Sequence, residues 1–189
     1  MTQIEQMIPM PGQQQQAVWR ALTVKSRREK LVAESLRNRG LEEFLPLYSS
    51  KRAWSDRTKI LEMPLFPGYV FCRFPNTQRL LTVSTPGVTS VVSFGGQDAV
   101  VLDDEIENVR RMLASGVPLE PWSYVRTGHV VEIHAGPLSG LRGTVIREKG
   151  LWRLIVNVEL LQRSVSAELG REMVQSIEPR SAIHMGAVA

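Results

Sequence analysis

Cysteine and histidine are scarce in this chain of 189 residues. It has one cysteine, Cys72, and three histidines, His129, His134 and His184. A single cysteine excludes an internal disulfide framework and a thiolate zinc site. The histidines have no metal-binding or catalytic-triad spacing, and His129 and His134 face opposite sides of a strand. We therefore expect no enzyme activity, no cofactor and no metal site.

Long apolar runs are also absent. No segment approaches the roughly 18 consecutive apolar residues of a membrane span. The first 16 residues are polar, with four glutamines at 13–16, and contain no apolar signal-peptide segment. We expect a cytoplasmic protein that is a monomer without a membrane partner, with loose tails at 1–16 and 181–189.

The net charge is only +4, but its distribution is uneven. Residues 17–61 carry eleven Lys and Arg against five Asp and Glu, a net of +6, whereas residues 98–120 carry two against six, a net of −4. A basic first segment suits a nucleic acid or an acidic partner. The alternative is a solvated basic face that binds nothing.

The first forty residues predict a strand followed by a helix. Apolar and polar residues alternate over 17–25, which indicates a strand. Ser26 and Glu29 have the spacing of a capping box, in which the glutamate reaches back to the serine N–H. An apolar stripe follows, and Gly40 is placed to end the helix.

Two prolines and a glycine mark a corner within residues 63–74, Met-Pro-Leu-Phe-Pro-Gly-Tyr-Val-Phe-Cys-Arg-Phe. Pro64 and Pro67 lack an N–H, so they describe a bent approach rather than a helix or a central strand. A strand is expected to begin directly after Gly68, which places Phe66 at the margin of the sheet. The strand places two sets on opposite faces: Tyr69, Phe71 and Arg73, against Val70, Cys72 and Phe74.

The other elements of residues 17–116 complete an α/β sandwich. They are a strand at 43–48, a polar connection at 51–59, a short helix at 76–83 capped by Asn76, and strands at 88–94 and 99–102. A second full helix follows, capped by Asp103 and stopped by Gly116, with Ile106, Val109 and Leu113 as its apolar stripe. This order predicts one antiparallel sheet with helices packed on it.

Beyond this unit the pattern changes. Residues 117–125 contain Pro118 and Pro121 without periodicity, which indicates a linker. Five short strands then follow within 126–180, at 129–134, 141–148, 151–158, 165–169 and 173–177, and their close spacing predicts a small closed barrel. The predicted fold class is α+β: an N-terminal antiparallel sheet with helices, a linker and a C-terminal five-strand β-barrel.

A glycine-rich loop connects the first two of these strands. Gly136, Gly140 and Gly143 punctuate it, and we expect positive φ angles or close backbone approach there. A glycine-rich loop between valine-rich strands resembles the KOW motif, which marks an SH3-like barrel. KOW modules also occur in ribosomal proteins, so this half alone does not decide the function.

The corner resembles the Phe-Pro-Gly-Tyr-Val corner of NusG-type transcription elongation factors. The half that contains this corner is followed by a linker and a KOW-like half. This order of parts is similar to that of the NusG family over roughly residues 17–178. The resemblance implies an N-terminal domain that binds the clamp helices of the RNA polymerase β′ subunit in an apolar depression, where aromatic anchors carry most of the binding energy. The matching positions are Phe66, Pro67, Tyr69, Phe94, Ile106 and Val109. Plain core packing is the alternative.

Two further sets match regions that touch polymerase or DNA in the family. Gln78, Arg79 and Thr82 correspond to contacts with the β gate loop or the non-template DNA strand, with a generic surface helix as the alternative. The other set is a basic loop with one aromatic residue, which suits upstream DNA or single-stranded nucleic acid unless it is merely solvated. Its members are Lys51, Arg52, Trp54, Arg57 and Lys59.

The resemblance also implies a partner for the C-terminal module, either a small-subunit ribosomal protein or the termination factor Rho. The corresponding loop residues are Gly136, Pro137, Leu138, Gly140, Leu141, Gly143 and Leu161. Three of these are leucines where phenylalanine is common, and Gln162 replaces a common glycine. The leucines keep the loop apolar, but they cannot stack as phenylalanine rings do. This argues against binding to Rho.

Several features resemble the specialised RfaH-type paralogues, among them the compact 43–61 region and the sequence Leu-Leu-Gln-Arg-Ser at 160–164. Such paralogues suppress pausing or termination in selected long operons. The many valines and isoleucines of the C-terminal half favour strands, so fold switching is not inferred. The competing hypothesis is a KOW-type ribosomal or ribosome-assembly protein, which would bind RNA through residues 126–180. That module carries a net of only +2, with eight Lys and Arg against six Asp and Glu.

Overall fold

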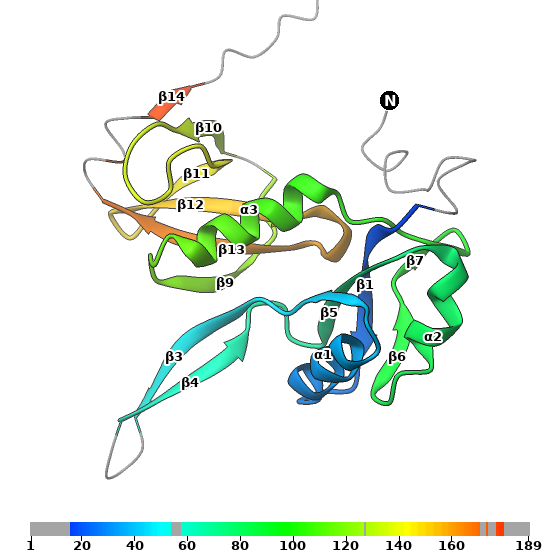
Figure 1. The fold of residues 1–189 in the computed structure, drawn as a ribbon. Coiled ribbons are helices and arrows are strands. Elements are labelled where there is room, and N and C mark those ends of the chain that lie inside the picture. Colours follow the sequence, from blue (N-terminus) through cyan, green and yellow to red (C-terminus); the bar gives the residue numbers. More distant parts are fainter. Residues whose placement is uncertain (1–15, 54–57, 127, 171–172, 174–176, 180–189) are drawn as a thin grey trace, which may run out of the picture.

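The computed structural model describes residues 16–53, 58–126, 128–170, 173 and 177–179. It has two parts: an N-terminal unit, residues 18–114, and a C-terminal sheet, residues 119–179 (Figure 1). The tails expected at the two ends lie, except for Gln16, outside the described residues, as do Trp54 and Arg57. No helix in the described part of the chain is long and apolar enough to cross a membrane.

The N-terminal unit is built on a four-stranded sheet of order β2-β5-β1-β6. Its strands are β1 (Val18–Val24), β2 (Glu42–Phe44), β5 (Tyr69–Phe74) and β6 (Val88–Val91), and every pair is antiparallel. The predicted alternation along β5 is confirmed. Phe71 packs in one apolar cluster, and Val70, Cys72 and Phe74 pack in another on the opposite face.

Helix α1 (Glu29–Asn38) covers the second of these faces. Val32 and Leu36 are fully buried there against Leu22 and Val70. The predicted stop is confirmed, because Gly40 has a φ of +75°, a conformation that side chains with a Cβ rarely adopt.

The capping box predicted at the start of this helix is wrong. The N-cap residue is Arg28, and no side chain caps the helix. Glu29 instead turns its carboxylate toward the corner, where Oε1 accepts the N–H of Gly68 at 2.9 Å. A long-range backbone donor therefore takes the place of the local serine N–H.

Strands β3 (Leu47–Ala53) and β4 (Thr58–Pro64) form a hairpin that extends away from the sheet (Figure 1). The predictions of one strand at 43–48 and a connection at 51–59 are wrong here. Pro46 separates β2 from β3, and the polar segment continues as paired strands. A hairpin that leaves the core needs no apolar face, so the period-2 signal that reveals half-buried strands is missing.

The rest of the unit is η3 (Asn76–Gln78), α2 (Arg79–Val83), β7 (Ser93–Phe94), β8 (Gln97–Asp98) and α3 (Asp103–Ala114). Asn76 makes no side-chain cap. The strand predicted at 88–94 breaks at Val92, and 99–102 is not a strand, although the N–H of Val101 donates to the carbonyl of Trp19 at 2.9 Å. The acidic first turn of α3 and its buried Ile106 and Val109 agree with the prediction, but the predicted cap is wrong, because the N-cap residue is Leu102 and Asp103 is already helical.

The C-terminal sheet has six antiparallel strands in the order β14-β10-β11-β12-β13-β9. They are β9 (Leu119–Ser123), β10 (His129–Ile133), β11 (Arg142–Glu148), β12 (Leu151–Val158), β13 (Arg163–Leu169) and β14 (Ile177–Pro179), with η4 (Glu159–Leu161) between β12 and β13. The last strand lies later than the predicted 173–177. Among the described residues no pairing joins the two end strands β14 and β9, so the sheet is not a closed barrel by its hydrogen bonds.

Part of the segment predicted as a linker is strand β9. Pro121 lies opposite Val165 of β13, and within the described residues β13 is the one strand that pairs with β9. An edge strand tolerates proline because the missing N–H can face away from the partner. The two prolines hid the strand from sequence reasoning, since proline normally argues against one.

One apolar cluster runs through both parts of the molecule. It contains Trp19 and Phe71 from the N-terminal sheet, Met112 from α3, and Ile133 and Leu154 from the C-terminal sheet. Helix α3 packs against β12 and is seen across the C-terminal sheet in Figure 1. The C-terminal sheet is therefore docked on the face of the N-terminal unit that α1 leaves open.

Candidate functional site

The face covered by this docking holds much of the predicted polymerase-binding set. Phe66, Ile106 and Val109 are each 1% exposed and belong to the shared cluster. The Phe66 ring meets Phe71 edge to face, with centroids 5.5 Å apart. Tyr69 is half-buried against the same cluster. The structure thus brings four of the six predicted residues into one apolar cluster.

The other two members lie outside that cluster. Pro67 is exposed at the corner. Phe94 is 55% exposed, at the turn of the β7–β8 hairpin. Phe94 is thus a large apolar side chain that already faces solvent in the docked arrangement.

The contact between the N-terminal unit and the C-terminal sheet is called the seam below. The predicted partner-binding loop of the C-terminal sheet also lies at this seam. Leu138, Leu141 and Leu161 are buried in the shared cluster, while Pro137 is exposed. The carbonyl of Gly140 accepts a hydrogen bond of 3.4 Å from Nη1 of Arg111 on α3. Both predicted binding surfaces therefore face each other.

The glycines of this loop have the backbone roles expected of them. Gly136 and Gly140 have φ angles of +80° and +79°. A Cβ on Gly143 would lie 2.6 Å from the carbonyl oxygen of Ile155, closer than real Cβ contacts allow. These features shape the loop, and nothing in them requires a bound partner.

Polar contacts across the seam join pairs of residues that the sequence did not predict to meet. The guanidinium of Arg163 lies 5.6 Å from the centre of the Tyr69 ring. Oε1 of Glu105, in the first turn of α3, accepts the backbone N–H of Glu159 at 3.0 Å. Single-sequence reasoning had no signal for these pairs, because each joins residues more than fifty positions apart.

Among the Asp and Glu residues of the described part of the chain, Glu105 has the most strongly perturbed pKa. It is 8% exposed. Burial raises the pKa of its carboxyl to about 7, and the charge of Glu159 adds to this shift. Glu159 in turn accepts a hydrogen bond from the hydroxyl of Tyr124, whose pKa is raised to about 12, mainly by burial. Two acids thus lie close together at the seam.

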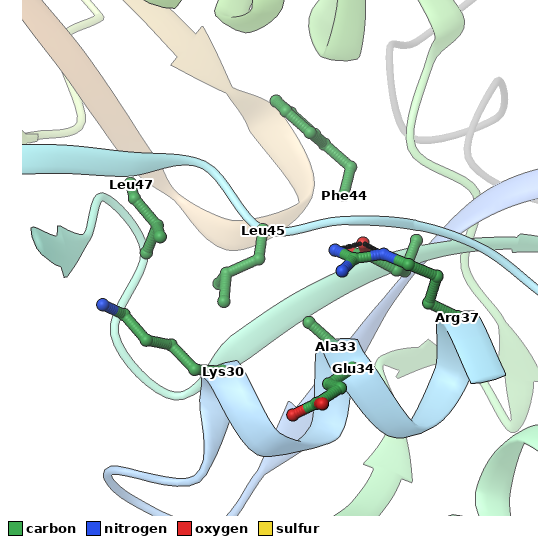
Figure 2. A pocket seen from close by; sticks show the side chains of 8 residues that line it. Lys30, Ala33, Glu34, Arg37, Phe44, Leu45 and Leu47 are labelled. Atoms are coloured by element: carbon green, nitrogen blue, oxygen red, sulfur yellow. Dashed lines mark hydrogen bonds and ion pairs between the residues drawn. The ribbon is translucent and has the colours of Figure 1, made fainter.

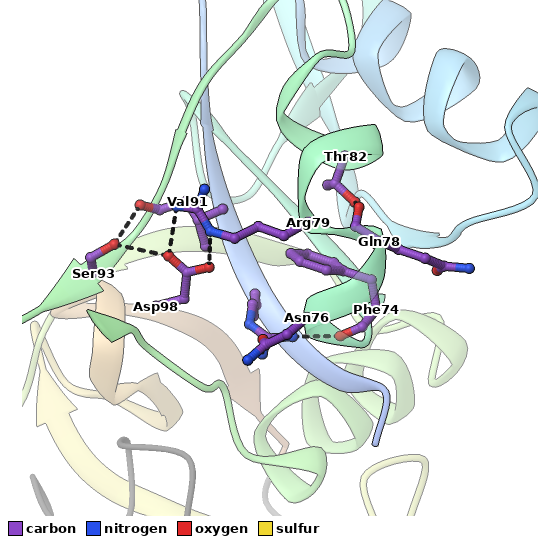
Figure 3. A network of polar contacts seen from close by, with 9 residues as sticks. Phe74, Asn76, Gln78, Arg79, Thr82, Val91, Ser93 and Asp98 are labelled. Carbon is purple, nitrogen blue, oxygen red and sulfur yellow. Dashed lines mark hydrogen bonds and ion pairs between the residues drawn. The ribbon is translucent and has the colours of Figure 1, made fainter. Parts of the chain in front are cut away.

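The set predicted to touch the gate loop or DNA is partly engaged inside the molecule (Figure 3). Arg79 donates from Nε and Nη2 to the Asp98 carboxylate at 2.6 and 3.0 Å. Thr82 is fully buried, and its hydroxyl donates to the carbonyl of Gln78 at 2.9 Å. The Gln78 side chain is exposed. Asp98 raises the pKa of Arg79, so this guanidinium stays charged.

A buried arginine supports the same region. Nη2 of Arg20 donates to Oδ1 of Asn76 at 2.6 Å, and Nη1 donates to the carbonyl of Phe74. Burial lowers the pKa of Arg20. The guanidinium joins the end of β5 to η3 and so positions the start of α2.

The predicted basic loop is the outer part of the β3–β4 hairpin. Lys51 and Arg52 lie in β3, with Arg52 paired in register with Lys59 of β4. Lys59 is exposed. Trp54 and Arg57 lie outside the described residues.

A groove of about 370 Å³ separates α1 from the chain at β2 and β3 (Figure 2). Leu45 and Leu47 point into it, whereas the Phe44 side chain turns away toward the shared apolar cluster, and Lys30 and Arg37 of α1 stand at the rim (Figure 2). Arg37 donates to Oε1 of Glu43. The rim charges are therefore at least partly paired within the chain.

In the described residues, no group of three or more His, Cys, Asp and Glu could hold a metal ion. Cys72 is fully buried, and burial raises the pKa of its thiol to about 12. A buried neutral thiol is a poor nucleophile.

Comparison with known proteins finds a family model that matches the N-terminal unit. Residues 17–110 match the NusG family model, described as "Transcription termination factor nusG". A solved structure titled "Domain interaction in Thermotoga maritima NusG" is similar at 21% identity over 89% of this chain and 99% of that one, with a TM-score of 0.49. A structure of the MjSpt4:Spt5 complex, conformation B, is similar at 20% identity over 87% and 97% of the two chains, with a TM-score of 0.30.

Proposed function

Because residues 17–110 form a domain of the NusG family, we propose that this protein is a transcription elongation factor that binds RNA polymerase through its N-terminal unit. The observation that supports this most directly is the family match, which spans the Phe66–Tyr69 corner. The protein acts by binding, without catalysis and without a cofactor, and it works in the cytoplasm as a monomer.

The polymerase contact comprises the corner and α3. The β′ clamp helices lie against Phe66, Pro67, Tyr69, Phe94, Ile106 and Val109. Three of these side chains are 1% exposed while the C-terminal sheet is docked. Binding therefore requires the sheet to leave this face, and exposed Phe94 is the anchor that polymerase reaches first.

Nucleic acid and the gate loop are further contacts of the N-terminal unit. Exposed Gln78 and the α2 helix behind it meet the β gate loop or the non-template strand, with Arg79 and Thr82 as supporting residues. The basic hairpin, with Lys51, Arg52 and Lys59, lies along upstream DNA through phosphate contacts. The hairpin's extension away from the sheet supports this role (Figure 1).

The C-terminal sheet is a KOW-type module that recruits a second partner. Its glycine loop and the leucines at 138, 141 and 161 bind a small-subunit ribosomal protein once the seam opens. The factor is a specialised RfaH-type antiterminator that suppresses pausing or termination in selected operons. Buried leucines at the seam support an apolar partner of this kind.

A pull-down of core RNA polymerase tests the proposal. The full chain and residues 1–118 should both retain polymerase, and the shorter chain should retain more because its face is uncovered. Loss of binding by both would overturn the proposal. Binding of RNA or ribosomes by residues 119–189 alone would instead support a ribosomal role.

A single substitution locates the contact. Phe94→Ala should weaken polymerase binding by roughly thirtyfold, the loss expected for an aromatic anchor worth about 2 kcal/mol. Val130→Ala is the matched control, because Val130 is 56% exposed on the C-terminal sheet. Equal binding by the two variants would remove Phe94 from the contact.

A further inference from the structure

Glu105 occupies an unusual position for an acid. It lies in the first turn of α3, directly beneath η4 of the C-terminal sheet, and is 8% exposed. Oε1 accepts the Glu159 N–H at 3.0 Å. Oε2 is buried and bonds to no group in the described part of the chain. A buried carboxylate oxygen without a donor is costly to keep charged.

The groups around Glu105 do not neutralise it. From η4 comes Glu159, another acid, and from the end of β9 comes Tyr124, which donates to Glu159. The remaining charged groups on the elements packed against α3 are engaged elsewhere, namely Arg126 over the Tyr124 ring, Arg153 of β12 with Glu120 and Glu148, Arg163 over Tyr69, and Arg142 with Glu132. No ion pair reaches Glu105 within the described residues.

We propose that Glu105 is a proton-controlled latch: its neutral carboxyl lets the C-terminal sheet dock on α3, and loss of the proton releases the sheet. The proton removes both the cost of a buried charge and the repulsion from Glu159. Oε1 can accept the Glu159 N–H in either state. This bond and one to the Leu102 backbone favour the charged carboxylate and lower the pKa, but burial outweighs them. The latch concerns docking alone, and only its consequence for polymerase rests on the proposed function.

The direction of the pH dependence follows from the two states. Undocked, Glu105 is an exposed acid near a helix N-terminus, with a pKa at or below the ordinary value of about 4.3. Docked, its pKa is raised to about 7. The docked state therefore binds more protons between these values. The equilibrium constant for docking therefore falls as pH rises through this window, by up to about tenfold per pH unit. Above the window it does not change further.

The test measures domain separation in the full chain by energy transfer between two dyes. Cysteines introduced by Thr89→Cys and Glu168→Cys, both at exposed positions, carry the labels. Native Cys72 is buried, so it does not take up dye. Transfer should fall as pH rises from 5.5 to 8.5. Transfer that does not change with pH would overturn the latch.

Variants assign the effect to this carboxyl. Glu105→Gln keeps the acceptor oxygen without the charge, so it should stay docked at every pH. Glu34→Gln removes an exposed acid from α1 and should titrate like the parent. If Glu105→Gln also titrates like the parent, the latch is wrong.

A second variant keeps the test decisive if Glu105→Gln fails to fold. Glu159→Gln removes the neighbouring charge, so less of the protein should be undocked at pH 8.5 than in the parent, and energy transfer should be higher. Unchanged opening in this variant would contradict the latch. A pH-dependent separation in a protein that never binds polymerase would uphold the latch and reject the proposed function, so the two fail independently.

Discussion

The backbone N–H of Gly68 donates a 2.9 Å hydrogen bond to Oε1 of Glu29. This bond ties the proline corner to the first turn of α1, 39 residues earlier. The Glu29 side chain is largely buried, with 7% of the residue exposed. The corner is thus fixed by a charge-assisted bond as well as by its prolines.

Replacing Glu29 should therefore destabilise the protein. Glu29→Ala leaves the Gly68 N–H without its acceptor, and the expected loss is about 1–3 kcal/mol in the free energy of unfolding. Urea unfolding followed by circular dichroism measures it. Glu34→Ala on the exposed side of the same helix should change stability by less than about 0.5 kcal/mol. Equal losses would mean that the bond to Gly68 contributes nothing.

A methyl group at Gly143 should disturb the C-terminal sheet. Its Cβ would lie 2.6 Å from the Ile155 carbonyl oxygen and 2.9 Å from Cδ1 of Leu154. Because backbone cannot move aside cheaply, Gly143→Ala should cost about 1–3 kcal/mol, the range for overpacking. Gly150→Ala meets nothing within 4 Å and carries only the strain of a φ of +83°. Thermal unfolding should rank Gly143→Ala as the less stable variant.

Removing Arg163 should loosen the docked sheet. Its guanidinium lies 5.6 Å from the centre of the Tyr69 ring, across the seam. An exposed cation–π contact is worth about 0.5–1 kcal/mol, so Arg163→Ala should shift the docking equilibrium roughly two- to fivefold toward the open form. The dye pair described above reports this shift. Arg147→Ala, which removes a comparable contact with Trp152 inside the sheet, should not move it.

Cys72 should resist modification in the native protein. Burial raises the pKa of its thiol to about 12, with smaller contributions from Glu43 and Glu42. An acid with a raised pKa stays neutral, and therefore unreactive, until the pH approaches that value. A thiol reagent at pH 8 should label it only after unfolding in denaturant. Fast labelling of the folded protein would show that β5 opens locally.

Much of the N-terminal unit could be predicted from its sequence. The alternation over 69–74, the stripe of α1 and the stop at Gly40 are local patterns that the core enforces, and the structure has all three. The corner was recognisable because prolines restrict the backbone and glycine permits the positive φ that a turn needs, whatever surrounds them. These signals belong to single segments.

The errors come from contacts between distant segments. Ser26 and Glu29 have the spacing of a capping box, but the Glu29 carboxylate accepts the N–H of Gly68 instead of the N–H of Ser26. The β3–β4 hairpin has no apolar face to reveal it, and β9 contains a proline that only an edge strand tolerates. Of the candidate site, the residues at the corner and on α3 could be chosen from their motif. Their burial beneath the C-terminal sheet depends on how the two parts pack, which no local pattern encodes.

Pro121 has a consequence for the behaviour of the sheet once it is free. An edge strand normally offers a row of N–H and C=O groups that can recruit another chain and begin aggregation. β9 forms one edge of the C-terminal sheet, and Pro121 at its centre has no N–H to offer. A strand from another molecule therefore cannot form a continuous row of backbone hydrogen bonds with this edge. The same proline that disguises the strand in the sequence helps to keep the released sheet from polymerising.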